Sequence, residues 1–150
     1  MNRCELANSY HKKGCNCAQS VLAAFADVTG LSEAESLAIA GGFGSGTGTG
    51  ELCGAITGAV MTLSQVNPVT IDDPVNGKKR AMGLSKEFQK RFFERFGHLR
   101  CADLLAEKYQ PDDATPAAKA MGLTGHCAIM IVTAVEIVEK MLAEKAPQKG

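Results

Sequence analysis

The spacing of apolar residues along the chain is that of α-helices. Apolar side chains recur three and four positions apart, which places them on one face of a helix. This pattern predicts helices over residues 3–13, 17–26, 33–40, 51–66, 79–96, 101–109 and 126–144, with one further turn at 117–121. We therefore predict an all-α fold, a compact multi-helix single domain over residues 1–150, with residues 146–150 as a frayed tail.

Capping residues support several of these helix boundaries. Asn16 is a good N-cap for the helix that begins at Cys17, and Ser32 with Glu35 forms a capping box for the helix that follows. Gly97 ends the helix before it, as glycine commonly does. We expect residues 68–77 to form a loop between two helices.

The helix at 79–96 has a narrow apolar stripe. Leu84, Phe88, Phe92 and Phe96 are spaced four apart, and Lys, Arg and Glu residues lie outside the stripe. The basic residues could suggest RNA binding. The interleaved glutamates and the phenylalanine stripe favour a solvated face over a core instead.

A glycine-rich loop and the helix after it form the centre of the predicted fold. Glycines at 41, 42, 44, 46, 48 and 50 lead to Cys53 and to a small-residue helix that contains Gly54 and Gly58. Glycine inside a helix costs about 1 kcal/mol relative to alanine, so the two helical glycines indicate a closely packed neighbour, within the chain or across a homodimer. We expect the loop to form the floor of a site, with Gly42, Gly44, Gly46 and Gly54 contacting a cofactor. A phosphate-binding reading is disfavoured because the loop lacks a G-K-[ST] ending.

Charge and composition narrow the function classes. Sixteen Lys and Arg balance 16 Asp and Glu, so nothing global indicates a nucleic-acid partner. The sequence has neither a secretory signal nor an apolar run of about 18 residues, so we expect a soluble, cytoplasmic protein without membrane insertion. Six cysteines in such a chain indicate metal binding or redox chemistry rather than a disulfide framework.

Four of the cysteines share one predicted setting. Cys17, Cys53, Cys101 and Cys127 each fall near the first turn of a predicted helix. Unpaired N–H groups and the helix dipole favour negative charge there, which predicts a lowered pKa and a larger thiolate fraction. If the four helix starts converge, they would form a pocket suited to a thiolate-bound cluster.

These residues resemble a known family, the redox-active proteins named after the cysteine signature C-GCAxxG-C-C. The resemblance is carried by Gly14 with the run NCAQS at 16–20, by GGFGSGTG and CGAITG in the central region, and by Cys101 and Cys127 in order. It covers roughly residues 5–142. The family is similar to a cysteine-rich domain of split-Soret-type cytochromes, which implies an iron–sulfur cluster on Cys17, Cys53, Cys101 and Cys127, and an unidentified redox partner protein.

Several alternatives remain open. Zinc would also suit four thiolates. A metal-free thiol–disulfide oxidoreductase would use Cys53 as the attacking thiol, and in a non-catalytic binding module the cysteines would only pack. Cys15 is either a resolving thiol or an ordinary boundary residue, and Cys4 is expected to be an unpaired helix cysteine. Of the three histidines, His126 adjoins Cys127, but we expect it to be a solvent-facing cap residue.

Overall fold

The computed structural model describes residues 1–110, 113 and 115–145, with the side chain of residue 145 left out; the predicted frayed tail at 146–150 lies outside the described residues. The predicted all-α fold is confirmed. The helices are α1 (Arg3–Lys12), α2 (Cys17–Ala24), α3 (Ala26–Thr29), α4 (Glu33–Ile39), α5 (Gly54–Val66), α6 (Pro74–Phe96), α7 (Cys101–Glu107), α8 (Pro116–Ala120) and α9 (His126–Lys145), with a short π-helical turn, η1 (Gly46–Gly50). An isolated antiparallel bridge joins Leu52 to Arg100.

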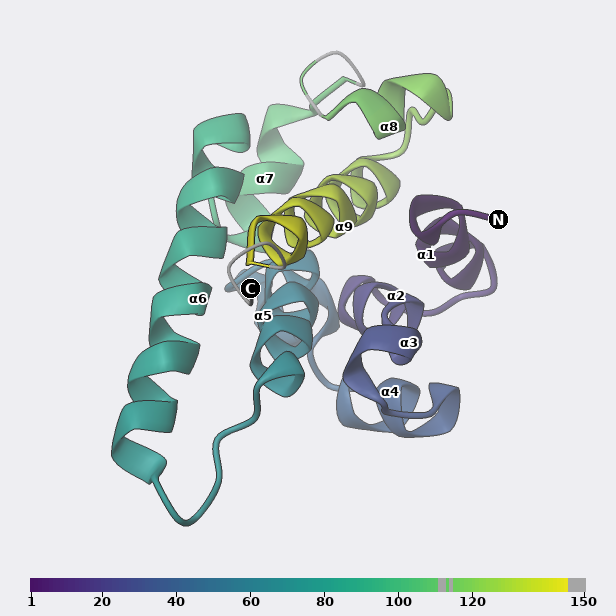
Figure 1. The fold of residues 1–150 in the computed structure, drawn as a ribbon. Helices are drawn as coiled ribbons and strands as arrows, with labels where there is room; N and C mark the ends of the chain where they lie inside the picture. Colours follow the sequence, from purple (N-terminus) through teal and green to yellow (C-terminus); the bar gives the residue numbers. More distant parts are fainter. Residues whose placement is uncertain (111–112, 114, 146–150) are drawn as a thin grey trace.

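Helix α9 runs through the middle of the molecule, with α1 and α2 on one side and α6 on the other (Figure 1). Its residues 128–135 are all buried, so the helix is enclosed on every side rather than along one stripe. Phe88, Phe92 and Phe96 of α6 are buried against this core, as their spacing predicts. No described helix has the length and apolar character needed to span a membrane.

The capping residues predicted from the sequence at Asn16 and Ser32 are confirmed. Complete capping boxes open α1, α2 and α4, the last two at Asn16 and Ser32 as predicted. The predicted loop at 68–77 is wrong in its second half, because α6 begins at Pro74 rather than at Lys79. Asp73 caps the helix by accepting a hydrogen bond from the Asn76 N–H, and proline at the first helical position is compatible with a helix start.

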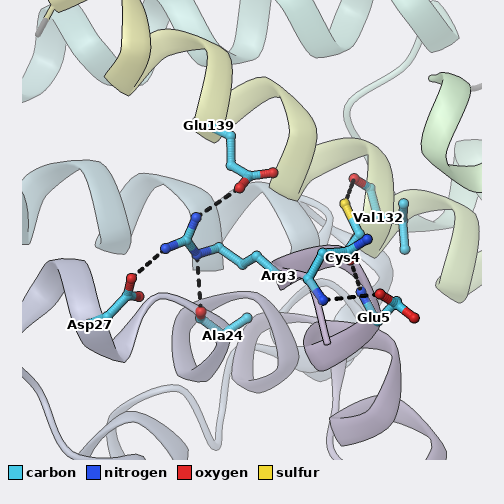
Figure 2. A network of polar contacts seen from close by, with 8 residues as sticks. Arg3, Cys4, Glu5, Ala24, Asp27, Val132 and Glu139 are labelled. Carbon is cyan, nitrogen blue, oxygen red and sulfur yellow. Dashed lines mark hydrogen bonds and ion pairs between the residues drawn. The ribbon is translucent and has the colours of Figure 1, made fainter.

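The N-terminal helix is held to the rest of the fold by Arg3 (Figure 2). Its guanidinium donates to the Ala24 carbonyl, 3.2 Å away, and forms ion pairs with Asp27 of α3 and Glu139 of α9. The same group lies 4.6 Å from the centre of the Phe25 ring. One side chain therefore ties α1 to three other elements.

Helices α2 and α5 approach each other at the two helical glycines. A Cβ atom on Gly58 would lie 2.7 Å from the Ala18 carbonyl oxygen and 3.0 Å from its Cα. A Cβ on Gly54 would lie 3.2 Å from the Ala18 nitrogen and from the Cys17 Cβ. The predicted close neighbour of α5 is therefore α2, within the same chain.

We expect Gly58→Ala to lower the free energy of unfolding by about 1–3 kcal/mol, because the added methyl group would push two backbones apart. Gly83→Ala is the matched control, since no atom lies within 4 Å of its Cβ position. That change should raise stability by up to about 1 kcal/mol, the helix-propensity difference. Urea denaturation measures the free energy of unfolding of both variants. A Gly58→Ala protein as stable as the native chain would show that α2 and α5 are not too close to admit a methyl group.

Candidate redox site

The four predicted site cysteines all lie at helix starts. Cys17 is the first residue of α2, Cys101 the first of α7, and Cys127 the second of α9, whereas Cys53 is the N-cap of α5. All six cysteines of the chain are free thiols. The placement inferred from helix-boundary signals is therefore confirmed for each of the four.

Two contacts bring these helix starts together around Cys53. The first is the α2–α5 packing, in which Gly54 has no side chain to separate Cys53 from Cys17. The second is the bridge at Leu52, where the Cys53 N–H donates to the Leu99 carbonyl at 2.9 Å and the Cys101 N–H donates to the Glu51 carbonyl at 2.6 Å. Cys53 thus lies beside both Cys17 and the segment that carries Cys101.

The glycine loop connects two of the cysteine-bearing helix starts. At its beginning, the Asn16 side chain donates to the Gly41 carbonyl at 3.1 Å, and Gly44 has no room for a Cβ, which would lie 2.4 Å from the Asn16 Cβ. At its end, a Cβ on Gly50 would lie 3.3 Å from the Cβ of Ala102 in α7. The loop therefore extends from the residue before Cys17 to the residue after Cys101.

The middle of the loop is a left-handed turn. Residues 45–48 all have positive φ angles, including the non-glycine residues Ser45 at 53° and Thr47 at 55°. Left-handed geometry costs a non-glycine residue about 1–2 kcal/mol. Gly46 is required here, because a Cβ would lie 2.4 Å from the Glu51 nitrogen. Gly42 differs from the other predicted glycines, since no atom lies within 4 Å of its Cβ position.

Cys17 and Cys127 interact directly through their thiols. A hydrogen bond from Cys17 lowers the pKa of Cys127 to about 6, and the positive charge of His11 acts in the same direction while burial opposes it. The same hydrogen bond, with burial and the charges of the other site cysteines, raises the pKa of Cys17. The shifts therefore have opposite directions, and they favour a negative charge on Cys127 over one on Cys17.

The remaining two site cysteines favour the protonated form. Burial raises the pKa of Cys53 to about 12, although the nearby backbone N–H groups of Ala55 and Ile56 lower it, and the charges of Cys101 and Cys127 raise it further. Burial, followed by the charge of Cys127, raises the pKa of Cys101.

The prediction that helix starts lower the pKa of every site cysteine is therefore wrong for Cys17, Cys53 and Cys101. Burial disfavours the charged thiolate, and repulsion from neighbouring thiolates disfavours it further. Together these two effects exceed the lowering of the pKa that the helix N-terminus provides. Each of the four cysteines also affects the pKa of at least one other.

Cys4 and Cys15 occupy other surroundings. Cys4 is buried in α1, where its thiol donates to the Val132 carbonyl oxygen 3.9 Å away, and burial raises its pKa to about 12 (Figure 2). Cys15 is half-buried just before α2, and its N–H donates to the Tyr10 carbonyl. The expectation of an unpaired helix cysteine is confirmed for Cys4.

Two histidines contribute more than their sequence context suggests. His11 of α1 is far from Cys127 in sequence, and only the packing of α1 against α9 brings its charge near that thiolate. His126 is half-buried rather than solvent-facing, and its Nδ1 is buried without a hydrogen-bond partner among the described residues. Burial lowers its pKa, so the ring favours the neutral form.

Glu51 is exposed and pairs with Arg100 at 3.2 Å.

Within residues 1–110, 113 and 115–145, no group of three or more His, Cys, Asp or Glu side chains is arranged to hold a metal ion. Three grooves in the described part of the chain lie along α6 rather than at the cysteines. The candidate site is thus a set of thiols at four helix starts.

Comparison with known proteins gives one family match. The model of the family described as "Putative redox-active protein (C_GCAxxG_C_C)" matches residues 15–141, a range that contains all four site cysteines. No curated protein and no solved structure matches the chain.

We expect Cys127 to be alkylated faster at pH 7 than the other three site cysteines in the metal-free, reduced protein, because its pKa is about 6. The rate should fall as the pH falls through 6, where the thiolate becomes protonated. Cys17→Ala removes the donated hydrogen bond and should move this midpoint upward, toward the ordinary cysteine value of 9.0. Iodoacetamide labelling with peptide mass analysis measures each rate; an unchanged midpoint in Cys17→Ala would contradict the thiol–thiolate pair.

Proposed function

Because the chain belongs to the C_GCAxxG_C_C family of redox-active proteins, we propose that its four helix-start cysteines form one redox site that holds an iron–sulfur cluster. The function would be electron transfer or redox sensing. The observation that supports the proposal is that Cys17, Cys53, Cys101 and Cys127 all lie at helix starts, and that α2 packs against both α5 and α9 while the Cys101 N–H donates to the Glu51 carbonyl beside Cys53.

The donor chemistry of the site fits such a cluster. Thiolates are the usual ligands of iron–sulfur clusters, and hydrogen bonds to their sulfurs tune the reduction potential. The Ala55 and Ile56 N–H groups lie near enough to the Cys53 sulfur to lower the pKa of this thiol. Three of the four thiols have raised pKa values through burial and mutual repulsion, and bound metal cations would offset both effects and favour deprotonation.

Zinc is the alternative metal for four thiolates, at Zn–S distances of about 2.3 Å. Among the described side chains, no group of three or more possible ligands is arranged to hold a metal ion. Either metal centre would therefore need the four helix starts to move relative to one another.

The burial of the individual cysteines suggests how electrons would reach the site. Cys53 is 3% exposed and lies at its inner side, where the α5 N-terminus contributes two N–H groups. Cys17, Cys101 and Cys127 are only half-buried. An electron-exchanging partner protein would therefore approach the side formed by the starts of α2, α7 and α9.

The cluster proposal predicts brown, iron- and sulfide-containing protein after anaerobic purification, with visible absorption that bleaches on reduction. Replacing Cys17, Cys53, Cys101 or Cys127 by Ala should each remove most of the iron. Cys4→Ala and Cys15→Ala are matched controls and should keep it, because their thiols lie elsewhere. Colourless, iron-free protein from a host that assembles such clusters would contradict the proposal.

A second candidate is metal-free thiol–disulfide exchange, which is favoured by the direct contact of Cys17 with Cys127. The Cys127 thiolate would attack a disulfide in a partner protein and form a mixed disulfide, releasing one partner thiolate. Cys17, after losing its proton, would then attack Cys127 and release the second. Two electrons and the single Cys17 proton would pass to the partner, whose second thiolate would take its proton from solvent, and a Cys17–Cys127 disulfide would remain. This assigns the attacking role to Cys127 rather than to Cys53.

The exchange candidate predicts a reversible Cys17–Cys127 disulfide in metal-free protein. Mild oxidation, alkylation and peptide mass analysis should find these two cysteines linked and Cys53 alkylatable only after unfolding. Cys127→Ser should abolish disulfide reduction, whereas Cys15→Ser should not affect it. If Cys17 and Cys127 stay reduced throughout a redox titration, the candidate is excluded.

A further inference from the structure

A second, apolar groove lies away from the cysteines, between α5, α6 and α9. It has a volume of about 940 Å³. Aliphatic and thioether side chains from these helices form much of its wall, among them Leu63, Val66, Leu84, Met141 and Leu142. Cavities of this size lined mainly by apolar side chains are typical of small-molecule sites.

The charges along the groove favour an anion. Arg91 is neutralised, since it pairs with Glu87 and Glu144, each at 2.7 Å. Lys79 and Arg80 also line the groove, both are exposed, and neither has an ion-pair partner within the described part of the chain. Among the described residues, two cations without an ion-pair partner therefore line an apolar groove together with a paired arginine that lies further along α6.

Gly83 keeps this groove open. It lies in the interior of the 23-residue helix α6, where glycine is less favourable than alanine. Close packing does not require it, because no atom lies within 4 Å of its Cβ position. By contrast, a Cβ on Gly77 in the same helix would lie 2.8 Å from Val69. The absent side chain at position 83 leaves space in the groove itself.

We propose that this groove binds a free, single-chain amphiphilic anion, of the long-chain carboxylate class. The acyl chain lies along the wall formed by Leu63, Leu84 and Leu142, and the carboxylate lies at Lys79 and Arg80. A concave groove encloses a single acyl chain on several sides, whereas a bilayer surface would need a convex apolar face. The inference is independent of the redox function, because none of the four site cysteines lines the groove.

Calorimetric titration of the reduced, full-length protein with dodecanoate, below its micelle-forming concentration, tests the proposal. We expect saturable binding of one molecule per chain. Dodecyltrimethylammonium has the same chain and the opposite charge, and it should bind at least tenfold more weakly. Absence of saturable dodecanoate binding, or equal binding of the cation, would overturn the proposal.

Charge variants locate the site. Lys79→Ala with Arg80→Ala should weaken dodecanoate binding at least tenfold. Lys86→Ala with Lys90→Ala removes the same charge from the same helix but from exposed residues that do not line this groove, and it should leave binding within twofold. Equal losses in the two double variants would show a general charge effect and overturn the assignment.

A variant that fills the groove distinguishes a blocked groove from an unfolded protein. Gly83→Leu should reduce dodecanoate binding at least tenfold while the melting temperature stays at or above that of the native protein, because leucine favours the helix. Unchanged dodecanoate binding in folded Gly83→Leu would overturn the proposal.

Co-sedimentation with phosphatidylglycerol vesicles tests whether the ligand is a membrane surface instead. A native protein that co-sediments with these vesicles but does not bind monomeric dodecanoate would also overturn the proposal.

Discussion

The contact on which the site depends is the close approach of α2 and α5 at Gly54 and Gly58. At Gly58 the limiting atoms are the backbone of Ala18, so a side chain there cannot be accommodated by a rotamer change. The same contact sets the distance between Cys53 and Cys17, because Gly54 faces the Cys17 Cβ. Backbone packing, rather than a flexible loop, thus positions the first two thiols.

The electrostatics of the site are a competition between helix termini and burial. Backbone N–H groups at the start of α5 lower the pKa of Cys53, yet it is about 12 because burial outweighs them. Cys127 is the exception, since a hydrogen bond from Cys17 lowers its pKa. Burial and the mutual repulsion of the thiolates therefore disfavour a second or third thiolate in the metal-free site.

Helix α6 combines two roles along its length. Its C-terminal half carries the phenylalanines that pack against the core, and Gly97 ends it in a left-handed conformation. Its N-terminal half borders the apolar groove and carries Lys79 and Arg80 without partners in the described residues. In the sequence, Leu84 and the three phenylalanines are spaced four apart and form one apolar stripe along the helix. In the structure the phenylalanine rings are buried, whereas Leu84 is half-exposed at the groove.

The sequence by itself determined every α-helix except the short α3, most of the capping residues, and the position of all four cysteines at helix starts, because these features depend on local hydrogen bonding and on apolar spacing. It also indicated a close neighbour for Gly54 and Gly58, since helical glycine is unfavourable without one. It did not identify α2 as that neighbour, the start of α6 at Pro74, or the charge of His11 near Cys127. Tertiary structure decided these points and the protonation of the thiols, because burial and contacts between distant residues set a pKa, and neither can be read from spacing along the chain.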